Sequence, residues 1–189
     1  GRNLIPNTNK GTTGWAYTCQ SGTHVHSAVT SLNVNANKST TSVISSGYHV
    51  ISRSIARSLI KNNTQYTVSF DIYCDFDTTM GLSIRNGNGQ NVLISWSNTT
   101  IKKSTWTKVV QTATSGTDTT TSQVLYISGF NTVGSVIFAN LKLEEGNKAT
   151  QWIPAQEDID SSVSAVKSIA DKNLAALGGV SYPKLCLLY

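Results

Sequence analysis

Residues 135–155, SVIFANLKLEEGNKATQWIPA, decide the fold class of this chain. From Val136 to Leu141 successive side chains alternate with a period of two, which is typical of a half-buried β-strand. The strand ends in a polar turn at 144–147, EEGN, and the chain leaves it through the pattern Ala-Thr-x-Trp-x-Pro at 149–154. This stretch therefore predicts a closing strand, a turn, and an exit segment at 149–154 that leads the chain away from the strand.

The same period of two recurs upstream, between short polar turns. The clearest strand is 64–74, and Asn-Gly-Asn-Gly at 86–89 predicts a hairpin turn because glycine tolerates positive φ. The long polar tract 27–46 carries few large side chains, and we expect a loop there with one edge strand at 32–35. The other expected strands cover 48–60, 80–85, 92–96, 106–113 and 123–130. About eight to ten strands with such turns predict an antiparallel sandwich, of either immunoglobulin-like or jelly-roll topology.

The two ends of the chain resemble those of a known family. Residues 1–7, GRNLIPN, are similar to its opening strand, Gly14-Trp15 to the loop after it, and the closing stretch to its last strand and exit. The family is the jelly-roll carbohydrate-binding domain of tail, baseplate and receptor-binding proteins from phages of Gram-positive bacteria. The resemblance covers residues 1–154. It implies an all-β antiparallel sandwich of jelly-roll type. A C-terminal helix within 155–189 is expected from the spacing of the apolar residues there.

The C-terminal segment has a different pattern. Residues 157–177 contain no Gly or Pro, and apolar side chains recur at intervals of three and four, which predicts an amphipathic helix. The apolar positions are Ile159, Val163, Val166, Ala170, Leu174 and Leu177. Asp158 or Asp160 is a candidate cap at its start, and Gly178-Gly179 a candidate end. Two roles stay open: a linker helix to another domain, and a coiled-coil seam between copies, for which the resemblance suggests a trimer.

Composition argues against several classes of partner. Only 13% of residues are charged, and the net charge of +5 comes from scattered Lys and Arg, whereas a nucleic-acid-binding protein concentrates them on one face. No segment is long and apolar enough for a transmembrane helix, so no membrane partner is expected. Cys19, Cys74 and Cys186 lack metal-binding spacing and make no disulfide framework, which fits a reducing cytoplasm. Cys74 ends the clearest strand and is predicted to face the core.

No motif in the sequence predicts catalysis. His24 and His26 have a spacing that can hold a metal, but no Cys, Asp or Glu stands at a supporting distance in the sequence, so we interpret them as surface histidines. Asp71 and Asp75 would share one face of one strand and cannot flank a glycosidic bond from two sides. The chain is therefore expected not to be an enzyme.

A polar strand face is the first candidate binding site. Asp71, Tyr73 and Asp75 alternate with the apolar side chains of their strand and are expected to point outward. A tyrosine ring stacks on the apolar face of a pyranose, and carboxylates accept hydrogen bonds from its hydroxyls. Arg53 and Arg85 are also expected to point outward. They would either add bidentate donors on the same face or pair with the two aspartates as an ordinary solvated surface.

Aromatic residues outside the predicted core are the second candidates. Trp96 precedes the polar turn at 97–99, and Trp96 and Tyr126 are the better candidates for stacking on a sugar, because binding residues concentrate near loops. The alternative is that each is a partly buried surface aromatic. Trp106 and Trp152 resemble packing residues of the family and are assigned to packing.

Many members of the resembled family hold a structural calcium between the first and the closing strand. Where the family often has Asp in the closing strand, this chain carries Asn140. Main-chain carbonyls near Asn7, together with Glu144, are the remaining candidate ligands, and calcium usually requires six to eight oxygens including carboxylates. No cofactor is therefore expected.

Together these features predict a non-catalytic carbohydrate-binding module of a phage tail or baseplate protein, adhering to host cell-wall polysaccharide. The expected partners are that polysaccharide, other tail or baseplate subunits and further copies of the chain. The expected location is the virion, assembled in the host cytoplasm. Two alternatives stay open. One is a structural spacer or oligomerisation module without a ligand, and the other is an ancillary binding module of a cell-wall hydrolase.

Overall fold

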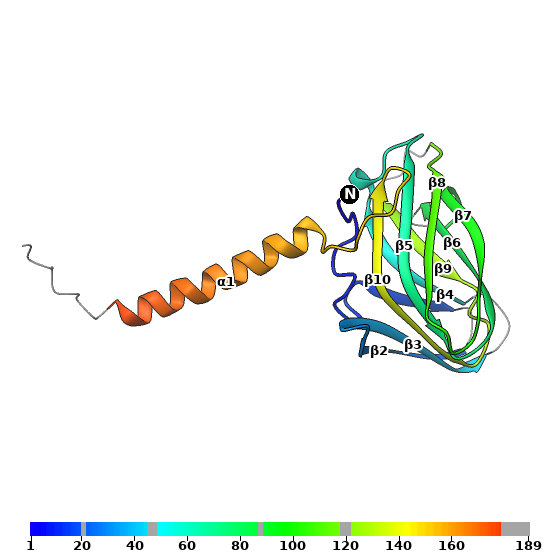
Figure 1. Ribbon diagram of the computed structural model, residues 1–189, viewed down its shortest axis with the longest axis horizontal. Helices are drawn as coiled ribbons and strands as arrows, with labels where there is room; N and C mark the ends of the chain where they lie inside the picture. The colour runs from blue at the N-terminus through cyan, green and yellow to red at the C-terminus, as the bar shows by residue number, and fades with distance from the viewer. Residues whose placement is uncertain (20–21, 45–48, 87–88, 118–121, 179–189) are drawn as a thin grey trace, which may run out of the picture.

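Two five-stranded sheets lie face to face, and a long helix extends away from them (Figure 1). The computed structural model describes residues 1–19, 22–44, 49–86, 89–117 and 122–178. Sheet I has the order β1-β4-β9-β6-β7, and its strands are β1 (Trp15–Cys19), β4 (His49–Ala56), β9 (Ser122–Ser128), β6 (Thr78–Asn86) and β7 (Val92–Ile101). Sheet II has the order β2-β3-β10-β5-β8, and its strands are β2 (Gly22–Ser31), β3 (Val34–Ile44), β10 (Gly134–Glu145), β5 (Gln65–Cys74) and β8 (Thr107–Thr114). A short 3-10 helix, η1 (Arg57–Leu59), follows β4.

All the paired strands run antiparallel, and consecutive elements repeatedly cross from one sheet to the other. The predicted fold class, an antiparallel jelly-roll sandwich followed by a C-terminal helix, is confirmed. The strands predicted at 48–60, 64–74, 80–85, 92–96 and 123–130 correspond to β4, β5, β6, β7 and β9. Residues 87–88 of the expected hairpin turn lie outside the described residues.

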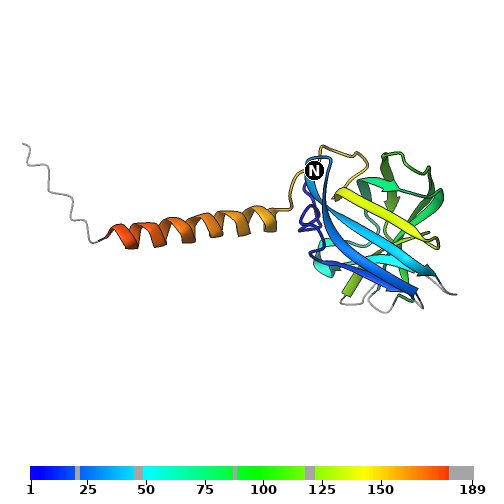
Figure 2. The same ribbon diagram turned by 90° about the horizontal axis from the view of Figure 1, so that it is seen from below.

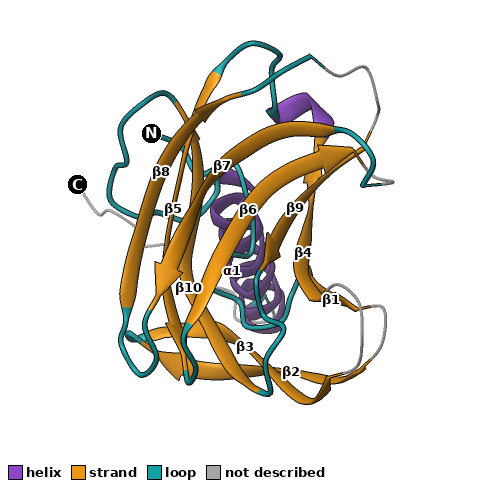
Figure 3. Ribbon diagram, turned by 90° about the vertical axis from the view of Figure 1, so that its right-hand side faces the viewer, coloured by secondary structure: helices purple, strands orange, loops and turns teal. Residues whose placement is uncertain are grey.

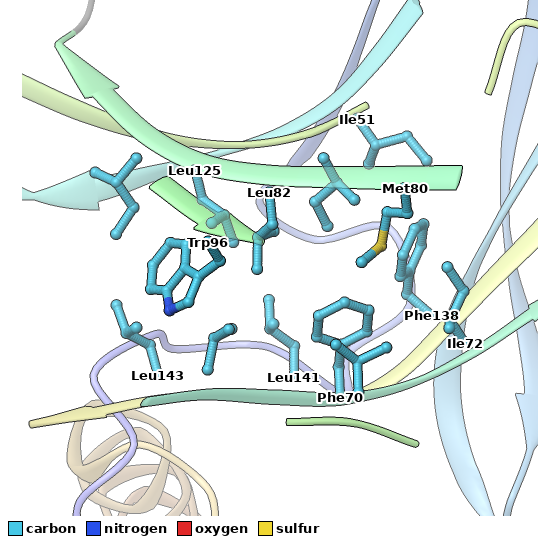
Figure 4. Close-up of a cluster of buried hydrophobic side chains, with 14 of the residues drawn as sticks. Ile51, Phe70, Ile72, Met80, Leu82, Trp96, Leu125, Phe138, Leu141 and Leu143 are labelled. Carbon is cyan, nitrogen blue, oxygen red and sulfur yellow. The ribbon is translucent and has the colours of Figure 1, made fainter. Parts of the chain in front are cut away.

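The core lies between the two sheets and is built from alternate residues of each strand. Phe70, Ile72 and Cys74 on β5 are fully buried, and Figure 4 shows Phe70 and Phe138 of sheet II facing Met80 and other apolar side chains of sheet I. The ring centroids of Phe70 and Phe138 are 5.9 Å apart. Burying one such side chain contributes roughly 1.5–3 kcal/mol. The predicted core position of Cys74 is confirmed, and burial raises the pKa of its thiol to about 12.

The prediction of a loop over most of 27–46 is wrong, because β2 and β3 form a long hairpin at the edge of sheet II. Leu32 and Asn33 make its turn, with φ of 52° and 61°. The inward side of β3 carries buried polar side chains, and the Ser39 hydroxyl donates to Asn37 Oδ1 at 3.2 Å. Since these residues hydrogen-bond instead of packing as hydrophobes, the apolar alternation that marks the other strands is missing here.

The expected opening strand at 1–7 is also wrong. Asn3 makes an isolated parallel bridge with Ala155, and the segment is otherwise irregular. The Asn3 side chain takes the place of a strand neighbour: its amide donates to the Leu141 carbonyl at 3.2 Å, and its oxygen accepts the Leu143 N–H at 3.2 Å. The opening segment therefore lies along the end of β10, beside the exit of the closing strand (Figure 1).

Helix α1 (Gln156–Leu177) confirms the helix predicted at the C-terminus. The candidate caps Asp158 and Asp160 are wrong, because the N-cap is Ala155 and Asp158 instead accepts the Asn7 N–H at 3.0 and 2.8 Å. Gly178 is the C-cap, as predicted. The first turn of the helix contacts the opening segment through Asp158, and the rest of the helix extends away from the sandwich, as Figure 2 shows. Among the described residues, no helix combines the length and hydropathy that a membrane crossing requires.

Candidate functional site

The structure distributes the predicted site residues over three places. Asp71 and Tyr73 lie on the outer face of sheet II, with Asp75 just past the end of β5. Arg85 and Tyr126 lie on the outer face of sheet I, which is turned to the viewer in Figure 3. The remaining two, Arg53 and Trp96, lie on the inner side of sheet I and are described separately below. One shared binding face is therefore excluded.

The prediction that Arg53 points outward is wrong. Arg53 is only 3% exposed, and its guanidinium donates to the carbonyls of Thr13, at 3.0 Å, and Pro6. Its Cζ lies 5.3 Å from the centroid of the Trp15 ring. Gly14 packs against the same guanidinium: a Cβ there would lie 2.8 Å from an Arg53 nitrogen, and its φ is 78°. Arg53 thus fixes the first loop to the sandwich, and burial lowers its pKa to about 10, so it stays charged at neutral pH.

Trp96 is also wrong as a surface candidate for stacking. It is 4% exposed and lies between the sheets, near Leu82 and Leu125 (Figure 4). The register of β6 and β7 explains this position, because Trp96 pairs with Leu82, which faces the core. The turn that marked Trp96 as a loop residue is absent, since β7 continues to Ile101.

The polar residues of sheet II make their contacts within the protein. The Asn140 amide donates to Asp71 Oδ2 at 2.8 Å, and Lys108 Nζ lies 3.6 Å from the same oxygen. Asp75 accepts the backbone N–H of Ser135 at 2.8 Å. These carboxylates therefore pair with a lysine, an amide and the backbone, and the expected pairing with the two arginines is wrong.

Tyr73 lies against another aromatic residue of sheet II. Its ring centroid is 5.6 Å from that of Trp106, and the two rings are tilted by 47°. Part of the tyrosine ring is thus covered by the indole, which agrees with the assignment of Trp106 to packing. The face of sheet II keeps the residue types that bind sugars, but one carboxylate oxygen of Asp71 and one of Asp75 already have partners.

Tyr126 occupies the centre of sheet I. It lies on β9, the middle strand, and is directly opposite Ser52 on β4 and Ser83 on β6. Both serines are small and nearly buried, so they form a low surface on either side of the half-exposed tyrosine ring. Gly89 approaches from the β6–β7 connection, where a Cβ would lie 3.6 Å from the tyrosine hydroxyl.

Arg85 is the diagonal neighbour of Tyr126 on this face. It pairs with Val124, two residues before Tyr126, and diagonal neighbours on adjacent strands lie about 7–8 Å apart. Its guanidinium donates to Ser83 Oγ at 3.1 Å and to the Gly89 carbonyl at 3.3 Å, which holds it along the sheet. Sequence reasoning selected Tyr126 and Arg85 but missed Ser52 and Ser83, because only the strand order shows that they flank the ring.

The candidate calcium ligands do not fit one cation. The Pro6 and Asn7 carbonyls accept from Arg53 and from the Lys10 N–H, the Asn140 side chain bonds with Asn9 and Asp71, and Glu144 pairs with the Lys142 ammonium at 3.2 Å. These are three separate networks, whereas calcium needs six to eight oxygens around one point. Among the described residues, no three His, Cys, Asp or Glu side chains are grouped closely enough to hold a metal.

The two histidines of the His-x-His pair are not simple surface residues. The Nδ1 atoms of His24 and His26 lie 3.0 and 2.9 Å from the hydroxyls of Thr41 and Ser39. The ring of Tyr17, from sheet I, stacks on His24 at a centroid distance of 3.9 Å. The pair therefore helps to close the edge between the two sheets.

Comparisons with known proteins bear on the family and the fold of this chain. A family model described as a carbohydrate binding domain matches residues 7–132. A comparison with curated protein sequences finds no relative. Three solved structures with a similar fold come from a phage tailspike and from two bacterial carbohydrate-binding modules.

The enzymatically active domain of tailspike protein 4 from bacteriophage CBA120 has a TM-score of 0.60 at 11% identity, over 76% of this chain and 21% of that chain. This chain thus spans about a fifth of the tailspike chain. The family 11 carbohydrate-binding module of a cellulosomal cellulase from Clostridium thermocellum has a TM-score of 0.54 at 16% identity, covering 80% and 98% of the two chains. The CBM22-1 xylan-binding domain of Paenibacillus barcinonensis Xyn10C has a TM-score of 0.53 at 14% identity, over 78% of this chain and 94% of that chain. At these identities the likeness concerns the fold alone.

The family match is the more specific result. Residues 7–132 make up well over half of the chain and include every strand of sheet I, with Arg85 and Tyr126 among them. The predicted carbohydrate-binding class is thereby confirmed at the level of the family. The chain belongs to the carbohydrate-binding domain family.

Proposed function

We propose that the chain binds a polysaccharide on the outer face of sheet I without altering it chemically. The observation that carries the proposal is the central position of Tyr126, between the short side chains of Ser52 and Ser83 and diagonal to Arg85. A ring that stands above small neighbours is open to stacking on a pyranose, and a guanidinium donates to pairs of sugar hydroxyls. None of the five strands of sheet I contains Asp or Glu, so they provide no pair of carboxylates for glycoside hydrolysis.

A matched pair of variants tests the proposed face. Tyr126→Ala and Tyr73→Ala each remove a half-exposed tyrosine from the outer face of one sheet. Isothermal titration calorimetry with extracted cell-wall polysaccharide should show binding weakened about tenfold or more by Tyr126→Ala, because the stacking surface is lost. Tyr73→Ala should bind as the wild type does. Loss in Tyr73→Ala alone would move the site to sheet II, and unchanged binding in both would refute the proposal.

We further propose that the ligand is cell-wall polysaccharide of a Gram-positive host and that the protein is part of a phage tail or baseplate in the virion. The terminal motifs within 1–154 support this setting, and the fold shared with a phage tailspike agrees with it. Binding of the fluorescently labelled chain to intact Gram-positive cells tests it. Binding to xylan or glucan with no binding to cells would favour the ancillary module of a hydrolase.

The exposed row of apolar side chains on α1, which consists of Ile159, Val163, Val166, Ala170, Leu174 and Leu177, favours an additional structural role. Val166 and Leu174 are 66% and 70% exposed, and the other large apolar residues of the row are also open to solvent. A helix with one apolar stripe gains stability by burying it against a partner. We propose that α1 joins copies of the chain, with a trimer as the expected assembly, so that several sugar-binding faces act together.

A further inference from the structure

A cavity lies on the side of the molecule opposite to the Tyr126 face. It has a volume of about 250 Å³, is open to solvent on one side and is bordered by the opening loop, the exit segment and the first turns of α1. Its lining residues are Asn9, Lys10, Trp152, Pro154, Asp158, Ile159 and Ser162. Figure 3 views the molecule onto sheet I and shows α1 behind both sheets, so this cavity and the Tyr126 face are on opposite sides. The proposed polysaccharide site does not use it.

The indole of Trp152 is held in place by its nitrogen. Trp152 Nε1 donates to Thr8 Oγ1 at 3.2 Å and to the Leu141 carbonyl at 3.1 Å, which fixes the polar edge of the ring against the sandwich. The side chain is half-buried, and Pro154 and Ile159 extend the apolar lining of the cavity. A ring fixed before binding loses little freedom when a ligand stacks on it.

The polar lining of the cavity is balanced in charge. Asp158 is buried, accepts the Asn7 N–H and lies 3.5 Å from Lys10 Nζ, whose side chain is half-exposed. Ser162, one helical turn later, is exposed at the rim. The carboxylate and the ammonium cancel, so the cavity favours a neutral ligand with hydroxyl groups over an anion or a cation.

The size of the cavity limits the ligand to one sugar ring. At about 30 Å³ per water, the cavity holds roughly eight waters, which is close to the volume of one hexose. We propose that this cavity, the Trp152 cavity, binds a single neutral pyranose, such as a terminal residue or side branch of a glycan. It would be a second sugar site, independent of the Tyr126 face, and a single module would then engage two glycan segments.

Two serines on α1 provide a matched test. Ser162 lines the cavity and Ser161 does not, and both are exposed, so Ser162→Phe should fill the cavity while Ser161→Phe serves as the control. The readout is the indole N–H signal of Trp152 in the 15N-labelled protein of residues 1–189, identified with Trp152→Phe and titrated with glucose and with N-acetylglucosamine. We expect a saturable shift with a Kd on the order of millimolar for at least one sugar. Ser162→Phe should weaken it at least tenfold, and Ser161→Phe should not.

The outcomes separate this proposal from the one for Tyr126. A Trp152 shift that persists in Tyr126→Ala supports an independent second site. If Trp152 does not respond to either sugar, or responds equally in Ser162→Phe, the inference is overturned even where polysaccharide still binds the Tyr126 face. A Trp152 signal that depends on protein concentration and not on sugar would also overturn it, because the cavity would then be filled by a second copy.

Discussion

His26 is a single residue that makes stability depend on pH. Its Nδ1 bonds with the Ser39 hydroxyl, and its ring centroid is 5.5 Å from that of Tyr17 on the opposite sheet. Burial lowers the pKa of His26 below 6.5, although a hydrogen bond with Asn37 acts in the opposite direction. The unfolded chain therefore binds the proton more readily than the folded one. The stability contributed by neutral His26 is complete above pH 6.5 and is lost as the pH falls through the lower pKa of the folded state.

The variant His26→Gln tests this pH dependence, because glutamine keeps hydrogen-bonding capacity and does not titrate. Thermal unfolding of both proteins is measured at about pH 7.5 and about pH 5.5, the range in which histidine titrates. The melting temperature of the wild type should fall more between these two values than that of His26→Gln. Equal decreases would show that His26 does not titrate differently in the folded and unfolded states.

The candidate site residues show how far sequence alone reaches at this scale. The period of two predicted that Tyr73 and Arg85 point away from the core, and it also gave Cys74 its inward position, whereas Tyr126 was selected as an aromatic residue near a loop. Arg53 was also expected to point outward, although it lies two residues from both Ile51 and Ile55 and shares their buried side of β4. The carbonyls that accept from this guanidinium belong to Pro6 and Thr13, and nothing in the sequence links them to Arg53.

Among the elements, β10 and its exit depend on a buried ion pair. Lys142 and Glu144 are 0% and 1% exposed on the outer side of β10, covered by the segment 147–155. Lys142 donates to Thr150 Oγ1 and to the Gln151 carbonyl. Burial raises the pKa of Glu144, but hydrogen bonds from Thr150 and Lys142 outweigh it and hold the pKa below its usual value. Both charged groups are therefore paired in the folded state.

Removing one partner of this pair should be costly. Lys142→Met leaves the Glu144 carboxylate buried with the Gly1 ammonium, 3.3 Å from its Oε2, as the remaining cation, and we expect a loss of about 3 kcal/mol in the free energy of unfolding, the low end for a broken buried pair. The double variant Lys142→Met/Glu144→Met should recover much of that loss, because two apolar side chains need no charge partner. Urea unfolding gives both values. Lys61→Met, which breaks an exposed pair with Glu145, is the control and should leave the midpoint nearly unchanged. A Lys142→Met variant as stable as this control would contradict the prediction.

Elements with apolar faces were predictable, and those with polar faces were not. The alternation along β5 and the three-and-four spacing along α1 gave both elements nearly at their observed bounds. The sequence did not predict the β2–β3 hairpin, because the inner side of β3 is lined with Asn, Ser and Thr, whose burial depends on partners in other strands. The irregular structure of the opening segment was not predicted for a related reason. The Asn3 side chain supplies its hydrogen bonds to β10, so no strand pattern is needed.

At the scale of the whole molecule, the order of the strands decides which residues can act together. The strands of Arg85 and Tyr126 are 37 residues apart at their pairing positions, Asn86 and Gln123, yet they are neighbours in sheet I. The strand of Tyr73 is closer to β6 in sequence and belongs to the other sheet. A face made from β4, β9 and β6 therefore could not be assembled from the sequence without the jelly-roll order.

Helix α1 is expected to strengthen weak sugar binding by joining copies of the chain. Val166→Asp places a charge in the middle of the exposed apolar row, whereas Ser164→Asp places it on an exposed position outside that row. Sedimentation should give an oligomer for the wild type and Ser164→Asp, and a monomer for Val166→Asp, because a carboxylate cannot be buried in an apolar seam at acceptable cost.

Oligomeric state and sugar binding can be separated in the same proteins. Val166→Asp should bind a short oligosaccharide as the wild type does, since the Tyr126 face is untouched. It should bind long cell-wall polysaccharide about 10²-fold more weakly, because a monomer lacks the raised effective concentration of linked sites. Adding Tyr126→Ala should abolish binding in either background. If the wild type sediments as a monomer at every concentration, α1 is a linker helix and each sugar-binding face acts alone.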